Sequence, residues 1–226
     1  MFDEYNARPV MNKETIRYHC SGCGACCRNV RDSVMLEALD AFRLLKHLSQ
    51  QYPERTTEDL LSEFAEPCML SRGYFIYVLK TVNDSGSCVF LQDNRCSIYP
   101  ARPRTCRLYP FALEPKERRM QWYLCLEQPQ HFTGSHTTAR EWERKNLSQE
   151  DKAFLRKEME VLPKLGELMK QIPNKLLPRA EALALAYTYH SYNLQKPFLP
   201  QYEQNMTELA LLLERMAIQG KTVTKK

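Results

Sequence analysis

The sequence lacks the features of secreted and membrane proteins. No stretch approaches the roughly 20 consecutive apolar residues that a helix needs to span a bilayer. The first residues include Asp3 and Glu4, where a signal peptide would carry a basic region followed by an apolar run. We therefore expect a cytoplasmic protein with no membrane association.

The sequence also lacks the motifs of several enzyme classes. It contains no glycine-rich G-x-G-x-x-G loop for a nucleotide-like cofactor, and no Ser/His/Asp or Cys/His catalytic arrangement can be assigned. Internal repeats and low-complexity tracts are absent as well. Catalytic residues therefore stay unassigned. His19, His131 and His136 are interpreted as ordinary polar residues, with His19 as a candidate for a supporting contact to the cysteines described below.

Complete disulfide pairing within one chain is excluded because the nine cysteines are an odd number. A reducing cytoplasm disfavours structural disulfides, so clustered thiols in such a protein are typical of metal binding or redox chemistry. Cys68 stands alone in an apolar setting and is interpreted as a small hydrophobic side chain. The other eight cysteines fall into two groups.

The chain of 226 residues is long enough for one large domain or two small ones. We predict an α+β protein, with a cysteine-rich metal-binding core that contains a small antiparallel β region, flanked by helices and followed by a helical C-terminal half. The predicted division is a cysteine-cluster region over 1–136, a helical region packed on it over 137–220, and a disordered tail over 221–226.

Apolar periodicity and capping residues predict individual helices. An amphipathic helix is expected over about 34–50, and the capping-box spacing from Thr56 to Asp59 opens a short second helix. In the C-terminal half, Pro163 is expected to start a fresh helical segment, and a last helix is expected over about 202–218.

The first cysteine group falls within eight residues and comprises Cys20, Cys23, Cys26 and Cys27. Two-residue gaps let neighbouring thiolates turn onto one ion, because a tight loop brings them within one coordination shell. Gly22 and Gly24 suit such a loop, since glycine accepts a positive φ. This stretch is predicted to form half of a metal site.

The second group is spread over a longer stretch and comprises Cys88, Cys96, Cys106 and Cys125. A hairpin with the three-residue loop 92–94 would place Cys88 and Cys96 on one face as diagonal neighbours. A short helix between Pro103 and Pro110 would hold Cys106 near free N–H groups, which favour a thiolate. Cys125 is expected on a final strand.

The adjacent pair Cys26-Cys27 favours more than one metal centre. Consecutive side chains point about 100° apart in a helix, or to opposite faces of a strand, so both sulfurs are not expected to ligate one mononuclear ion. The spacing matches neither the ferredoxin run C-x2-C-x2-C-x3-C-P nor the paired C-x2-C of zinc ribbons. Spacing alone therefore leaves an iron–sulfur cluster and zinc open.

The positive charge of the chain gathers beside the second cysteine group. Between Arg95 and Arg119, seven basic residues stand against two acidic ones, which accounts for the whole net charge of +5. Such a stretch is explained either by nucleic-acid binding or by compensation of anionic metal–thiolate centres. Compensation is favoured because the arginines interleave with cysteines and the stacked aromatics of a single-strand platform are lacking. A nucleic-acid partner is not expected.

Several motifs together resemble one known family. They are Cys-Ser-Gly-Cys-Gly-Ala-Cys-Cys-Arg (20–28), Cys-Val-Phe-Leu (88–91), Cys-Ser-Ile-Tyr (96–99), Arg-Pro (102–103) and Cys-Arg-Leu-Tyr-Pro (106–110). Over roughly residues 18–126 the chain resembles the CxxCxxCC family of zinc- or iron-chelating proteins, whose relatives include flagellin lysine-N-methylase. The resemblance implies a metal held by eight motif cysteines, here Cys20, Cys23, Cys26, Cys27, Cys88, Cys96, Cys106 and Cys125. It implies little about activity, and the part after residue 137 carries no such resemblance.

Three functions compete. The favoured one is an iron–sulfur protein that serves redox chemistry or a methylase-like reaction, because the family resemblance narrowly favours iron–sulfur over zinc. The alternative is a non-catalytic zinc module with closed four-ligand sites, whose helices bind a protein partner. Nucleic-acid binding through residues 95–119 ranks last. Whether the protein is an enzyme, and on which substrate or partner it acts, stays open.

Overall fold

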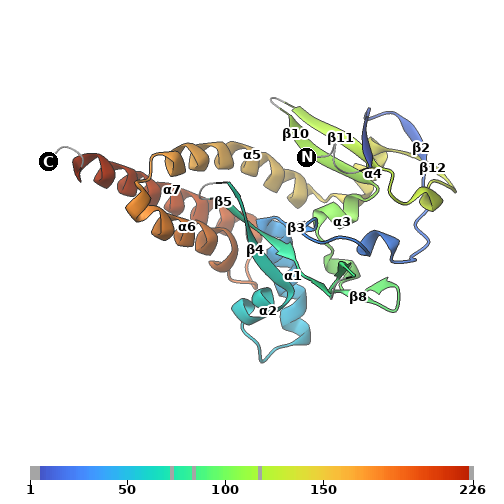
Figure 1. Cartoon of the computed structure of the whole chain (residues 1–226), viewed down its shortest axis with the longest axis horizontal. Coiled ribbons are helices and arrows are strands. Elements are labelled where there is room, and N and C mark those ends of the chain that lie inside the picture. Colours follow the sequence, from blue (N-terminus) through green and yellow to red (C-terminus); the bar gives the residue numbers. More distant parts are fainter. Residues whose placement is uncertain (1–5, 72–73, 83–84, 117–118, 224–226) are drawn as a thin grey trace. The chain divides into compact units, whose positions relative to one another are not determined.

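The computed structural model describes residues 6–71, 74–82, 85–116 and 119–223 (Figure 1). It combines small antiparallel sheets with helices, and its C-terminal part is mostly helical. The predicted α+β class is confirmed. No helix in these ranges is both long enough and apolar enough to cross a membrane.

The chain forms two compact units, each made of two separate segments. The first unit consists of Met1–Val34 and Lys80–Ser148, and the second of Met35–Leu79 and Gln149–Lys226. All eight cysteines of the two groups belong to the first unit, whereas Cys68 belongs to the second. The two units therefore alternate along the chain, and the predicted division into regions 1–136 and 137–220 stays a prediction.

The larger sheet of the first unit has the strand order β1-β11-β10. It joins β1 (Ala7–Val10), β11 (Arg119–Cys125) and β10 (Phe111–Lys116), all antiparallel. Trp122 and Leu124 alternate along β11 and are buried, as expected when one sheet face packs on a core. Cys125 ends this strand opposite Ala7, so the predicted strand with Cys125 is confirmed, although a later strand over His136–Thr138 follows it.

The rest of the first unit consists of short elements. Pairs of strands are β2 (Thr15–Arg17) with β12 (His136–Thr138), β6 (Thr81–Val82) with β7 (Ser87–Cys88), and β8 (Leu91–Gln92) with β9 (Arg95–Cys96). Short helices are η2 (Ala25–Cys27), η3 (Tyr99–Ala101), α3 (Arg104–Leu108), η4 (Pro129–His131) and α4 (Ala139–Asn146). A capping box between Thr138 and Glu141 opens α4.

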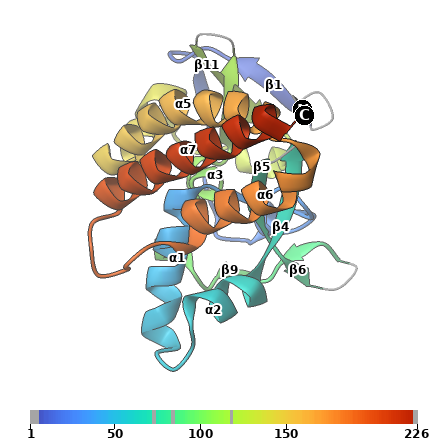
Figure 2. The ribbon, with the colours of Figure 1, turned by 90° about the vertical axis from the view of Figure 1, so that its left-hand side faces the viewer.

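The second unit combines a three-stranded sheet with long helices. The sheet has the order β3-β5-β4, formed by β3 (Met35–Leu36), β5 (Tyr74–Leu79) and β4 (Ala65–Ser71), which carries the half-buried Cys68. Its helices are α1 (Ala38–Gln51), α2 (Thr57–Phe64), α5 (Gln149–Lys170), η5 (Asn174–Leu176), α6 (Leu177–Leu185), the π-helical turn η6 (Ala186–His190) and α7 (Phe198–Val223). Helices α5 and α7 lie side by side (Figure 2).

One apolar core holds the helices of the second unit together. Its buried members come mainly from α1, α5 and α7, and include Leu39, Phe42, Phe154, Met169, Phe198, Tyr202, Leu209 and Leu213. The buried carboxylate of Asp151 is neutralised by Arg43, whose guanidinium lies 2.6 Å from it. Charge at this position is therefore paired rather than isolated.

The predicted helices are found with changed ends. The predicted helix over 34–50 is α1, and the capping box of Thr56 and Asp59 opens α2 as expected. The prediction at Pro163 is wrong, because α5 continues through this residue. The last helix extends beyond 202–218 to Phe198–Val223, so residues 221–223 of the predicted tail are helical and 224–226 lie outside the described residues.

Truncation of the helical core should destabilise the protein. Leu213 is completely buried, so Leu213→Ala should lower the free energy of unfolding by about 2–5 kcal/mol through lost burial and a residual cavity. Leu211 lies in the same helix with 49% of its surface exposed, and Leu211→Ala should change this free energy by less than about 0.5 kcal/mol. Urea denaturation followed by circular dichroism measures both, and equal effects would contradict the assigned core.

Candidate metal centre

The first cysteine group lies in a tight loop that needs its glycines. Gly22 and Gly24 have φ values of 67° and 68°, in the left-handed region that glycine alone adopts at little cost. The loop then closes a turn of η2, in which the N–H of Cys27 donates to the carbonyl of Gly24 at 3.0 Å. The predicted role of both glycines is confirmed.

This loop packs directly against the β8–β9 turn. A Cβ atom at Gly24 would lie 2.8 Å from the carbonyl oxygen of Asn94 and 2.8 Å from Leu91 Cδ1, which is too close for any side chain. The guanidinium of Arg28 adds hydrogen bonds to Asn94 Oδ1 and to the carbonyl of Cys23. The first cysteine group is thereby placed beside the hairpin that carries Cys96.

The predicted register of this hairpin is wrong. Leu91 pairs with Cys96 and Gln92 with Arg95, so the loop has two residues, Asp93 and Asn94, rather than three. Both loop residues have positive φ values (47° and 60°), as in the tight turns that match the twist of paired strands. The shared strand face predicted for Cys88 and Cys96 is lost with the three-residue loop.

The chain nevertheless brings Cys88 back toward Cys96. Cys88 belongs to a different strand pair, opposite Thr81, and the chain turns at Val89 and Phe90 before β8 begins. The N–H of Ser97 donates to the carbonyl of Phe90 at 2.9 Å, which closes this bend. A bend thus replaces the regular ladder that the sequence predicts.

The thiols of the two groups act on one another. A hydrogen bond with Cys27 is the main reason that the pKa of Cys26 lies well above its ordinary value. Burial raises the pKa of Cys88, and the charges of Cys96 and Cys26 raise it further. Burial also raises the pKa of Cys96, again with a contribution from Cys26. Cys26 is therefore the residue at which the two groups meet.

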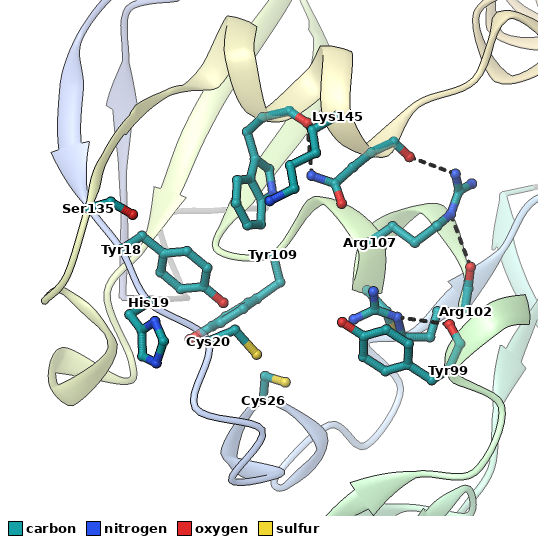
Figure 3. A pocket seen from close by; sticks show the side chains of 13 residues that line it. Tyr18, His19, Cys20, Cys26, Tyr99, Arg102, Arg107, Tyr109, Ser135 and Lys145 are labelled. Carbon is teal, nitrogen blue, oxygen red and sulfur yellow. Dashed lines mark hydrogen bonds between the residues drawn. The ribbon is translucent and has the colours of Figure 1, made fainter.

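Three of the predicted ligands line one cavity of about 310 Å³: Cys20, Cys26 and Cys106. Figure 3 shows Cys20 and Cys26 at this cavity. Tyr18, Tyr109 and Arg102 are among the other lining residues. Burial and the neighbouring thiolates, Cys26 first, raise the pKa of Tyr109, and the remaining predicted ligand Cys125 contributes to this effect. Cysteines of both groups thus surround the same tyrosine.

His131 is a site residue that the sequence did not reveal. Its ring is buried, with Nε2 3.2 Å from Cys23 Sγ and Nδ1 3.4 Å from the hydroxyl of Tyr109. Its carbonyl accepts the N–H of His19 at 2.9 Å, which ties η4 to the start of the cysteine loop. The supporting contact expected of His19 is therefore made by His131, which no spacing motif connects to the cysteines.

Comparison with known proteins identifies a matching family model. Residues 19–151, more than half of the chain, match the family model CxxCxxCC, described as "Putative zinc- or iron-chelating domain".

The chain belongs to the CxxCxxCC family.

Among curated proteins, the chain is similar to "Uncharacterized protein MJ0661" of Methanocaldococcus jannaschii, with 29% identity over 116 residues. The matched part is 48% of this chain and 56% of that relative, so the chain spans little more than half of the relative's length. No solved structure matches the chain.

The donor chemistry of this CxxCxxCC domain fits a zinc or iron centre. Thiolates are the ligands that suit zinc and iron–sulfur clusters, and thiols of both groups interact across the loop packing described above. Within the described residues, no three His, Cys, Asp or Glu side chains are gathered closely enough to hold one ion. The eight-cysteine ligand set therefore stays a prediction.

The glycines of the CxxCxxCC loop give a sharp test of its packing. Both Gly22→Ala and Gly24→Ala introduce a left-handed alanine, which costs about 1–2 kcal/mol. In Gly24→Ala the added Cβ atom would in addition clash with the carbonyl oxygen of Asn94 and displace the loop, whereas a Cβ atom at Gly22 has no other atom within 4 Å. Metal retained per chain after dialysis should therefore fall markedly more for Gly24→Ala, and equal losses would contradict the packing.

The contact between Cys23 and His131 predicts a reactive thiol in the metal-free, reduced protein. Hydrogen bonds from Ser21 and His131 lower the pKa of Cys23 to about 7, whereas burial raises that of Cys125 to about 11. Since the thiolate is the nucleophile, alkylation of Cys23 by iodoacetamide should rise through pH 7, at which Cys125 is still protonated.

Substitution of the histidine should shift this profile. His131→Phe keeps a ring in place but removes the hydrogen bond, so the alkylation midpoint of Cys23 should move to higher pH, as measured by peptide mass spectrometry. His136→Phe, at an exposed position of β12, serves as the control and should leave the midpoint unchanged. An unshifted midpoint in His131→Phe would show that the contact does not act on the thiol.

Proposed function

We propose that this protein is an iron–sulfur protein whose two cysteine groups together hold its metal, and that it serves redox chemistry. One observation carries the proposal: Cys20, Cys26 and Cys106, from both groups, line a single cavity. The ligands would be the eight cysteines of the family motif. His131 would support Cys23 through the contact of its Nε2 with the sulfur, and Tyr109 would in turn hold the other ring nitrogen of His131.

The family resemblance favours iron–sulfur over zinc. The number of thiols is compatible with both, because a structural zinc ion and an iron–sulfur cluster each take four cysteine ligands. An iron–sulfur cluster would supply one-electron transfer at a potential set by hydrogen bonds, charge and exposure around its sulfurs. Arg102 favours the thiolate of Cys26 and of Cys96, so it offsets negative charge where both groups meet.

A non-catalytic zinc module is the second candidate. The strand pairs β6–β7 and β8–β9 contain two residues per strand, which is too little backbone pairing to be stable alone. A metal that cross-links these ladders would stabilise the first unit without any turnover. This candidate predicts a colourless protein that unfolds when a chelator removes its metal.

Metal analysis of anaerobically purified protein distinguishes the two candidates. The proposal predicts iron with acid-labile sulfide, the broad visible absorption of thiolate-bound iron, and a reversible redox couple. Cys26→Ser and Cys88→Ser should each remove most of this absorption, because the two thiols come from the two groups. Cys68→Ser lies in the other unit and should retain it. Stoichiometric zinc with no redox couple would overturn the proposal in favour of the zinc module.

A further inference from the structure

The cavity beside Cys20 and Cys26 has a second, chemically different wall. Figure 3 shows Cys20 and Cys26 on one side and Lys145 on the far side, with Tyr18 and Tyr109 between them. The far wall is formed by α4, which contributes Trp142, Lys145 and Asn146. A volume of about 310 Å³ lies at the small end of the range for small-molecule sites.

The walls of the cavity are cationic. Arg102, Arg107 and Lys145 line it, and none of the described residues that line it carries a carboxylate. The two arginines are engaged within the wall: Arg102 lies 3.6 Å over the ring of Tyr99, and Arg107 donates to the carbonyl of Asn146 at 2.9 Å. Arg102 also favours the thiolates of Cys26 and Cys96, so it offsets negative charge on the cysteine side of the cavity.

Lys145 is the third cation of the cavity wall, and it lies on α4. Its ammonium lies 5.5 Å from the centre of the Trp142 ring, which holds it at the cavity wall by a cation–π contact. It forms no ion pair with any residue in the part of the chain that the structure describes. An ammonium held in place without a carboxylate leaves its charge available to an anion.

Trp142 supplies a second group for an anion. Its indole Nε1 is buried and has no hydrogen-bond acceptor among the described residues. A buried N–H without an acceptor is costly, and an acceptor brought by a ligand removes that cost. Trp142 and Lys145 both line the cavity, and together they carry one neutral donor without an acceptor and one charged donor.

The remaining surface favours a flat molecule. The Tyr18 ring packs edge-on against Trp142 with centroids 5.2 Å apart, and against Tyr109 at 6.2 Å. Aromatic edges and faces of this kind pack well on a planar ring. We propose that the cavity binds a small planar carboxylate, whose anionic group is held by Lys145 Nζ and Trp142 Nε1–H.

This inference deepens the proposed function and rests on it in one respect: three proposed metal ligands line the same cavity, so the carboxylate would bind beside the metal. The ligand site itself depends on α4 and the tyrosines. A binding experiment therefore tests the carboxylate site whether the protein contains iron or zinc.

The experiment is calorimetric titration of the metal-replete protein with benzoate as the probe and benzamide, its neutral analogue of the same shape, as the comparison. We expect benzoate to bind at least tenfold more tightly than benzamide. Lys145→Gln should weaken benzoate binding at least tenfold, and Trp142→Phe, which keeps a ring but removes the N–H, should weaken it several-fold.

Arg144→Gln is the matched control. Arg144 also lies in the last turn of α4, is exposed and does not line the cavity, so this variant removes the same charge without touching the site. Equal effects of Arg144→Gln and Lys145→Gln, equal affinity for benzamide and benzoate, or no binding at all would overturn the proposal. Binding by the metal-free protein alone would also overturn it, because the cavity would then be the space that the metal occupies.

The metal content of the same sample separates the two proposals. Zinc in place of iron, together with benzoate binding that depends on Lys145, would refute the iron–sulfur function and retain the carboxylate site. Iron and sulfide without benzoate binding would refute the carboxylate site and retain the iron–sulfur function.

Discussion

Mutual repulsion of thiolates is the constraint on which the first unit depends. The pKa of Cys26 is raised by its hydrogen bond with Cys27, by burial, and by the charges of Cys27 and Cys23. Burial raises the pKa of Cys88 and of Cys96, and the charge of Cys26 raises both further. These thiols therefore ionise only if positive charge enters the site, either from a metal or from side chains such as Arg102. The elements that carry these thiols are too short to hold the charges together by backbone pairing alone.

Close packing of backbone on backbone helps to hold the cysteine-bearing segments together. The missing side chain at Gly24 lets the cysteine loop rest on Asn94, and Arg28 joins the two segments by hydrogen bonds. Behind the loop, η4 brings His131 to Cys23, and Tyr109 closes the far side of the imidazole. The thiols are thereby supported from two sides by residues distant in sequence.

Short-range features of this fold could be predicted from the sequence, because they depend on neighbouring residues. The capping box of Thr56 and Asp59 and the left-handed glycines of the cysteine loop are of this kind.

The hairpin register was not predicted correctly, because Asp93 and Asn94 both accept positive φ, which makes a two-residue turn as accessible as the predicted three-residue loop. Pro163 was misjudged because the packing of α5 against α7 outweighs the loss of one backbone hydrogen bond. The role of His131 could not be predicted from the sequence, because its contact with Cys23 spans 108 residues and is created by tertiary structure.

The alternation of the two units has a consequence for how the protein is made. Strand β1 pairs with β11 and β2 with β12, so the N-terminal strands find their partners more than 100 residues later in the chain. Contacts of such long separation form late, because loop closure must precede them. During synthesis the loop of Cys20 and Cys23 leaves the ribosome long before the segments that carry Cys106 and Cys125. Until those segments are made, the early thiols lack the neighbours that surround them in the folded unit, and exposed thiolates are the reactive form of cysteine.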